Sequence, residues 1–186
     1  MRRMSKLSSL ALLIAACILI LTPQKTYGKE DELRGDALIN KVCEKTPSKE
    51  VCTETLKRDP RSQTGGAKVM ALISVQEAKN NATDILRHLK VLVVDDSLEP
   101  EIQQGISDCL DILRDAKEQL NTATAAMLVK VGEDTVKWLQ AAVDAVDTCE
   151  DYLQGHDNIL LHKEDNFRLM CNISLSICKA LDNNQL

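Results

Sequence analysis

Apolar residues recur every three or four positions through four long segments of this chain, and this periodicity constrains its fold more than any other feature. The segments run from about Gly66 to Val94, from Pro100 to Leu120, from Val136 to Leu153 and from Phe167 to Leu181. Such spacing places the apolar side chains on one face of a helix. Because four such stripes cannot be buried singly, the pattern predicts an all-α fold built around an antiparallel four-helix bundle.

An N-terminal helical hairpin is expected ahead of the bundle, with its turn at Thr46-Pro47. Aromatic residues make up only 2% of the chain. No alternation of apolar and polar residues of useful length indicates strands. We therefore expect a single helical domain, with the hairpin at about residues 30–60 and the bundle at about residues 66–183.

The first 28 residues are typical of a cleaved secretion signal. A positively charged head is followed by an apolar run from Leu7 to Leu21 and then by polar residues. This run is shorter than the roughly 20 residues that a membrane-spanning helix needs, so a retained membrane anchor is the less favoured alternative. We predict a signal peptide at residues 1–28 and a mature domain at residues 29–186.

The predicted mature chain is acidic. The full sequence contains 23 basic and 28 acidic residues, and the signal peptide contains four of the basic residues and no acid, so the mature net charge is −9. This charge disfavours nucleic acid as a partner. It fits either simple solubility or attraction to a basic partner.

Two disulfides are expected among the six cysteines beyond the signal peptide, in a compartment that favours disulfides. Cys43 and Cys52 flank the hairpin turn and would lie on its facing sides. Cys109 and Cys149 each lie in the apolar stripe of a long helix, and a bundle that joins the stripes would bring their sulfurs together. We therefore expect the pairs Cys43–Cys52 and Cys109–Cys149.

The remaining two cysteines are expected to stay reduced. Cys171 and Cys178 are seven residues apart. In a helix this separates their Cα atoms by roughly 10.5 Å, which is too far for a disulfide. Buried free thiols are favoured. Neither a metal site nor a cofactor is expected, because the sequence has no C-x-x-C pair and no matching histidine spacing.

No catalytic apparatus is recognisable, and we predict that the protein is not an enzyme. The histidines are His88, His156 and His162. His88 lies beside basic residues and is expected on a solvated helix face. His156 and His162 follow Gly155 in a link, where they could bind metal or act as a base. Solvent exposure is the favoured interpretation, because no partner residue is recognisable by spacing.

A glycosylation sequon begins at Asn81, within Asn81-Ala82-Thr83. It lies on the predicted polar side of its helix, which favours Asn81 as a modified residue. A second sequon at Asn172 lies next to Cys171 in the last helix, where packing disfavours modification.

Several segments together resemble the plant invertase and pectin methylesterase inhibitor family. They are residues 38–43 with Thr46-Pro47 and Cys52, then residues 56–62, 109–116 and 134–151. The resemblance covers essentially the whole mature chain. It implies a four-helix bundle with an N-terminal hairpin and the same disulfide pairing that spacing predicts. The implied activity is inhibition of a cell-wall enzyme in a one-to-one complex in which the bundle blocks the substrate cleft.

The resemblance leaves two target enzymes open. Invertase inhibitors of the family can carry a Pro-Lys-Phe motif before the fourth-cysteine helix, where this chain has Gly132-Glu133-Asp134. The segment around Trp138 and the additional Cys171 are closer to the pectin methylesterase type. We therefore favour pectin methylesterase as the partner, with acid invertase as the alternative. A secreted helical binding module without an enzyme target is an alternative of another class.

The favoured target implies a location and a contact surface. The protein would act in the apoplast or cell wall, or in the vacuole if the target were a vacuolar invertase. The contact surface would be the outward faces of the segments Gly66–Val94 and Pro100–Leu120 with the link that follows. The candidate contact residues are acidic: Glu77, Asp84, Asp111, Asp115, Glu118 and Glu133. The alternative for each is that it only solvates its helix.

Overall fold

The structure is a computed structural model that describes residues 33–156 and 158–186. The predicted signal peptide lies outside the described residues. The described part of the chain consists of helices and links and contains no strand. Its helices are α2 (Gly35–Cys43), α3 (Lys49–Arg58), α4 (Arg61–Thr64), α5 (Ala67–Leu92), α6 (Pro100–Val129), α7 (Glu133–Tyr152) and α8 (Lys163–Asp182).

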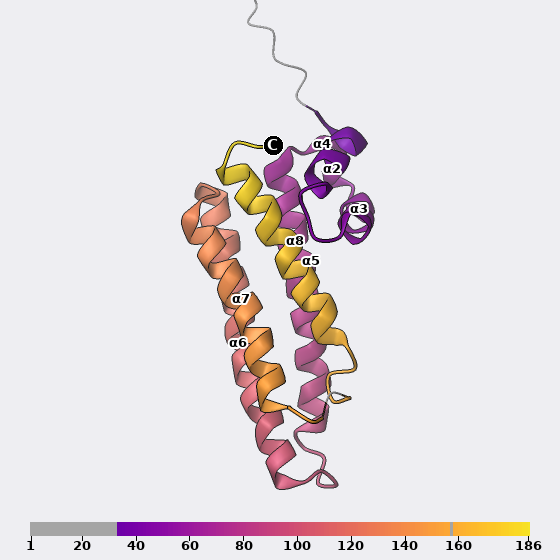
Figure 1. The fold of residues 1–186 in the computed structure, drawn as a ribbon, viewed down its shortest axis with the longest axis vertical. Helices are drawn as coiled ribbons and strands as arrows, with labels where there is room; N and C mark the ends of the chain where they lie inside the picture. Colours follow the sequence, from indigo (N-terminus) through magenta and orange to yellow (C-terminus); the bar gives the residue numbers. More distant parts are fainter. Residues whose placement is uncertain (1–32, 157) are drawn as a thin grey trace, which may run out of the picture. The chain divides into compact units, whose positions relative to one another are not determined.

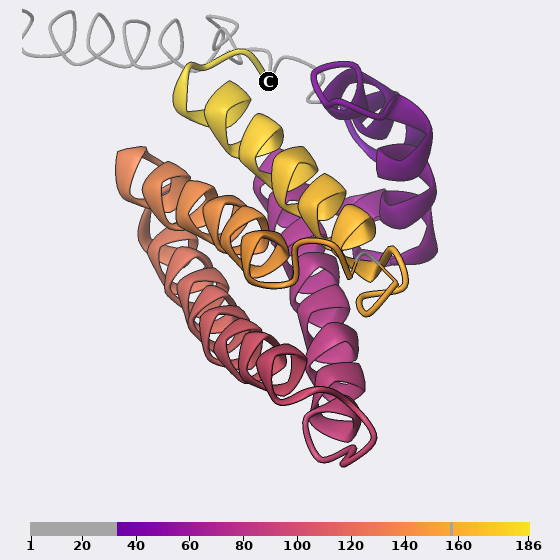
Figure 2. The same cartoon turned by 60° about the horizontal axis from the view of Figure 1, so that its bottom comes forward.

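Helices α5 to α8 form a four-helix bundle in which successive helices run antiparallel (Figure 1). Figure 2 shows α6 beside α7 and α5 beside α8. Since α5 also contacts α6 and α7 also contacts α8, the four helices enclose one core. The predicted all-α bundle is confirmed.

The core is built from the apolar stripes of the bundle helices together with side chains from the hairpin. Burying a Leu, Ile or Phe side chain stabilises a fold by about 1.5–3 kcal/mol, so these stripes supply most of the driving force. The largest fully buried side chains are Ile39, Leu56, Met70, Ile85, Leu89, Ile106, Leu113, Leu120, Met127, Leu139, Phe167 and Ile173.

Helix α6 is longer than predicted. It continues to Val129, whereas the sequence predicted its end near Leu120, so the link that was expected to follow Leu120 begins only at Lys130. Ala123 and Met127 extend the buried stripe through this part of the helix. The hydroxyls of Thr122 and Thr124 donate to backbone carbonyls four residues earlier, at 3.0 and 2.8 Å. Both hydroxyls are thereby satisfied within the helix, and the buried stripe accounts for its continuation beyond Leu120.

The N-terminal hairpin consists of α2 and α3, which pack on α5 and α8 (Figure 1). Ser48 caps α3, because its hydroxyl accepts a hydrogen bond of 3.4 Å from the backbone N–H of Val51. A disulfide joins Cys43 to Cys52 across the turn, with their Cα atoms 5.6 Å apart. The short helix α4, which the sequence did not predict, leads from the hairpin into α5.

A second disulfide joins α6 to α7 through Cys109 and Cys149, whose Cα atoms are 4.6 Å apart. About one turn before Cys109, Gly105 lies against the end of α7. A Cβ atom at this position would lie 2.6 Å from the carbonyl oxygen of Tyr152. Glycine therefore permits a close approach of the two helices that the disulfide also holds.

Cys171 and Cys178 are buried free thiols in α8. Burial raises the pKa of the Cys171 thiol far above its ordinary value and raises that of Cys178 to about 12. Both side chains therefore remain uncharged at neutral pH and behave as small apolar core residues.

The two disulfides should stabilise the fold unequally, because they close loops of different length. We expect the double variant Cys109→Ala/Cys149→Ala to lose about 4 kcal/mol in the free energy of unfolding and Cys43→Ala/Cys52→Ala about 2.7 kcal/mol. Urea denaturation of both variants beside the unmodified protein measures this order. A larger loss for the hairpin variant would contradict the loop-length explanation.

Candidate functional site

The structure places the three histidines in different surroundings. His88 is half-buried, and its Nε2 atom lies 2.6 Å from the carbonyl oxygen of Ile159. The expectation that His88 lies on a solvated face was therefore wrong, because the link before α8 folds back onto α5 and covers this side chain. His156 and His162 are exposed, as predicted.

Three of the six predicted contact acids are engaged in ion pairs within their own helices. Asp84 and Asp111 each pair with the arginine three residues later, the first at 2.6 Å. Glu133 pairs with the lysine four residues later at 2.8 Å, and the hydrogen bond from this lysine lowers the pKa of Glu133. Exposed pairs of this kind contribute little to stability. A bound partner would nevertheless have to compete with them.

The other three acids differ in whether their carboxylates accept a hydrogen bond. Glu77 and Glu118 each accept a hydrogen bond from the asparagine three residues later, at 3.0 and 3.2 Å. Asp115 is exposed and has no hydrogen bond or ion pair with any residue that the structure describes. Asp115 therefore has the least engaged carboxylate of the six predicted acids, whereas Glu77 and Glu118 are each hydrogen-bonded to a neutral amide.

Asp115 lies in a surface groove between α6 and α7 with a volume of about 310 Å³. Asp144 of α7 lines the same groove, and its carboxylate accepts a hydrogen bond of 3.0 Å from the side-chain amide of Gln140. The amide oxygen of Gln119 is buried there without a hydrogen-bond donor among the described residues. The groove is lined by Ile112, Asp115, Gln119, Ala141, Asp144, Ala145 and Thr148.

The lining of this α6–α7 groove is of a kind that suits a positively charged group. The carboxylates of Asp115 and Asp144 line it, and no basic side chain does. Asp144 and Gln119 were not among the contact residues predicted from the sequence. Both residues lie outside the apolar stripes of their predicted helices. The periodicity of a single helix does not show which of its polar positions lies next to a neighbouring helix.

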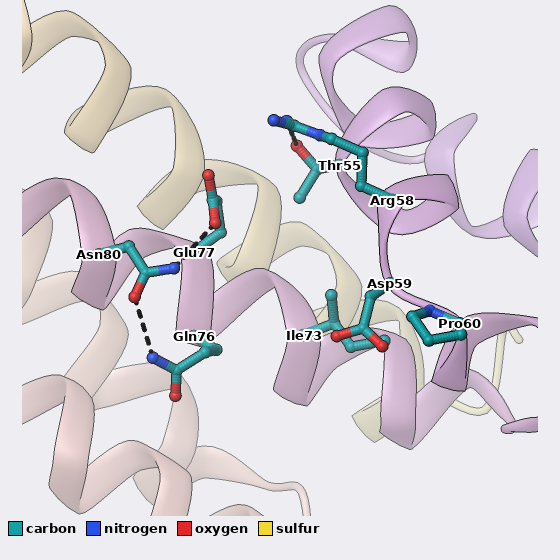
Figure 3. Close-up of a pocket in the computed structure, with 8 residues that line it drawn as sticks. All are labelled: Thr55, Arg58, Asp59, Pro60, Ile73, Gln76, Glu77 and Asn80. Atoms are coloured by element: carbon teal, nitrogen blue, oxygen red, sulfur yellow. Dashed lines mark hydrogen bonds between the residues drawn. The ribbon is translucent and has the colours of Figure 1, made fainter.

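Glu77 lies apart from this groove, in an open pocket of about 260 Å³ between α3 and α5 (Figure 3). Figure 3 shows the amides of Gln76 and Asn80 linked to one another, with Asn80 also donating to Glu77. On the facing side, the guanidinium of Arg58 donates to the hydroxyl of Thr55 at 3.3 Å. Most polar side chains that line this pocket are therefore hydrogen-bonded to one another.

Asn81 lies on the same face of α5 as Glu77 and Asp84. At 3.6 residues per turn, the directions of the three side chains fall within about 60° around the helix axis. Asn81 is half-buried, and its amide donates to the carbonyl of Glu77 at 3.0 Å. A glycan attached to Asn81 would therefore cover the part of α5 that contains both predicted acids.

A family profile described as plant invertase/pectin methylesterase inhibitor matches residues 37–177. The chain belongs to this family. Members of the family are inhibitor proteins rather than enzymes. Its description includes two kinds of target, an invertase and a pectin methylesterase.

Individual relatives of both kinds are similar to the chain. A pectinesterase inhibitor from Actinidia deliciosa is 27% identical over 147 residues, which cover 77% of this chain and 79% of that protein. A protein from Platanus acerifolia named "Putative invertase inhibitor" is 26% identical over 146 residues, covering 76% of this chain and 81% of the relative.

A solved structure supports the fold. The crystal structure of a mutant form of a pectin methylesterase inhibitor from Arabidopsis matches with a TM-score of 0.64 and 22% sequence identity. The match covers 75% of this chain and 94% of that chain. The inhibitor family and its helical fold are thus shown for this protein.

The contact of His88 with the link should contribute to stability. We expect His88→Ala to lower the free energy of unfolding by about 1 kcal/mol, because the carbonyl of Ile159 loses its partner. We also expect faster proteolysis within residues 153–162. The matched control is His156→Ala, which removes an exposed histidine from the link that His88 contacts. Equal effects of the two variants in urea denaturation and limited proteolysis would contradict this role of His88.

Proposed function

We propose that the protein is a secreted inhibitor of pectin methylesterase that forms a one-to-one complex and blocks the substrate cleft of the enzyme. Family membership supports inhibition of an enzyme of this kind. The observation that carries the proposed contact is the α6–α7 groove, with the free carboxylate of Asp115 beside that of Asp144.

The groove suits a basic side chain of the target enzyme. A lysine or arginine entering it would meet the carboxylates of Asp115 and Asp144, neither of which is paired with a cation of the described residues. Hydrogen bonds that involve charged groups are stronger than neutral ones. The disulfide Cys109–Cys149 holds α6 and α7 together. This constraint keeps the entropic cost of ordering the site on binding small.

The α5 face is the less suitable contact surface. Asp84 is already paired with Arg87, and a glycan on Asn81 would cover its neighbours. The proposed contact therefore lies on α6 and α7, centred on Asp115, rather than being spread over all six predicted acids.

Acid invertase is the second candidate target, and the similarity to the Platanus acerifolia protein favours it. Two sequence features favour pectin methylesterase. One is the acidic Gly132-Glu133-Asp134 before α7, where invertase inhibitors can carry Pro-Lys-Phe. The other is Cys171, a buried thiol of α8.

We further propose that the mature protein acts in the cell wall, or in the vacuole if its target is a vacuolar invertase. The signal peptide predicted at residues 1–28 supports entry into the secretory pathway. No helix among the described residues is long and apolar enough to cross a membrane.

The target is tested by titrating the purified mature protein into assays of pectin methylesterase and of acid invertase. We expect pectin methylesterase activity to fall to a plateau at one equivalent while invertase activity is unchanged. Saturating inhibition of invertase alone would support the alternative target. Inhibition of neither enzyme would contradict the proposal and favour a helical binding module of another kind.

The contact surface is tested by neutralising single acids. We expect Asp115→Asn to raise the inhibition constant at least about tenfold, which corresponds to about 1.4 kcal/mol, because the basic partner loses its charged acceptor. The matched control is Asp84→Asn on α5, for which we expect a change below about twofold. The reverse order of the two variants would place the contact on α5.

A further inference from the structure

A second polar pocket lies at the opposite side of α7, where the link from α7 enters α8. Its volume is about 320 Å³. It is lined by side chains of the end of α7, the link and the first turn of α8: Glu150, Leu153, His156, Leu160, His162, Glu164 and Asp165. None of these residues belongs to the α6–α7 groove, so the pocket is independent of the proposed inhibitory contact.

Three potential metal ligands converge in this pocket. One ligand atom each of His162, Glu164 and Asp165 lies within 4.8 Å of the other two. Nδ1 of His162 lies 3.6 Å from Oδ2 of Asp165. Two ligands at 2.0–2.2 Å from a tetrahedral zinc ion are about 3.3–3.6 Å apart. The pair already has this separation, and the exposed His162 can adjust toward Glu164.

Glu164 supplies an independent indication of a ligand. Its side chain lines the pocket, although the residue is only 9% exposed. One of its carboxylate oxygens, Oε2, is fully buried and has no hydrogen-bond partner among the described residues. Burying a carboxylate oxygen without a partner is costly, so such a group is ordinarily satisfied by a donor or a cation.

The backbone presents the histidine in an uncommon conformation. Leu161 and His162 both lie in the left-handed region, with φ of 54° and 58°. Residues other than glycine adopt this conformation at a cost, and such residues occur in turns and cluster at functional sites. Here the conformation ends the link and places His162 directly before Glu164 and Asp165 at the start of α8.

We propose that His162, Glu164 and Asp165 bind one divalent transition-metal ion, for which Zn²⁺ is the best-fitting ion. One imidazole nitrogen with two carboxylate oxygens is a donor set suited to zinc, whereas Ca²⁺ and Mg²⁺ prefer oxygen ligands alone. Three protein ligands leave one coordination position for water. The bound ion would neutralise the buried carboxylate and fasten the link to α8.

The ion pairs of Arg168 indicate which acidic residues near the pocket are free to bind the metal ion. Its guanidinium lies 2.6 Å from Glu150 and 3.0 Å from Asp147, so these carboxylates are occupied. Its distance to Asp165 is longer, at 3.5 Å. Asp165 can therefore turn from the arginine to a metal ion, while Glu150 stays in its ion pair and borders the pocket without binding the ion.

Calorimetric titration of the metal-free mature protein, without an affinity tag, with ZnCl₂ tests the site. We expect binding of one equivalent, and Ca²⁺ in tenfold excess should not displace it. His162→Ala and Glu164→Gln should each weaken binding at least about tenfold. Asp151→Asn, which removes an exposed acid of α7 close to the link, is the matched control and should leave the affinity unchanged within about twofold.

Spectroscopy of the cobalt(II)-substituted protein separates a built site from loose surface binding. We expect the intense visible absorption of tetrahedral cobalt, and its loss in His162→Ala, a change of an exposed residue that should leave the circular dichroism of the fold intact. Absence of saturable zinc binding, or binding that neither variant weakens, would overturn the proposal. Because these measurements need no target enzyme, their outcome is separate from that of the inhibition assays.

Discussion

The close approach of α6 and α7 is the contact on which the proposed function depends. Gly105 leaves room for the carbonyl of Tyr152 at one end, and the disulfide Cys109–Cys149 fixes the two helices one turn further along. Small side chains such as Ala141 and Ala145 line the surface between the helices and leave a groove instead of filling it. The acceptors in the groove are consequently held on a rigid support, and Asp115 needs no rearrangement to meet a partner.

The bundle could be predicted from the sequence because its apolar stripes have the period of a helix. The chain also has few aromatic residues, which would favour strands. The end of α6 could not be predicted from the sequence in the same way. Thr122 and Thr124 belong to a residue type that is common in turns, and only the structure shows that their hydroxyls bond back to the helix carbonyls. Ala123 and Met127 carried a signal of helix continuation, since they keep the spacing of the buried stripe.

The candidate site was predictable only in part, for a physical reason. A sequence shows that Asp115 and Asp84 are charged, but their availability depends on neighbours. Asp84 has an arginine three residues later that reaches it, whereas Asp115 has no such partner. The contribution of Asp144 from another helix depends on the register between α6 and α7, which the disulfide sets. Likewise, the environment of His162 depends on a turn of the backbone that no spacing rule indicates.

The surface of the described domain thus divides into regions with different chemistry. The α6–α7 groove has two carboxylates without a cationic partner among the described residues, the α5 face has Asp84 paired with Arg87 beside a glycosylation sequon, and three potential metal ligands lie together at the start of α8. An inhibitor can use the first region to bind its target while the other two affect secretion or stability. Under the proposed function, one small domain of net negative charge thus presents a single preferred contact surface.

The most direct test of this account is hydroxyl-radical footprinting of the mature protein, free and in complex with pectin methylesterase. The account predicts that oxidation of side chains along residues 112–119 and 141–148 falls on complex formation, while the hairpin of α2 and α3 and the start of α8 stay as accessible as before. Protection confined to the hairpin or to α5, with the α6–α7 groove still accessible, would contradict it.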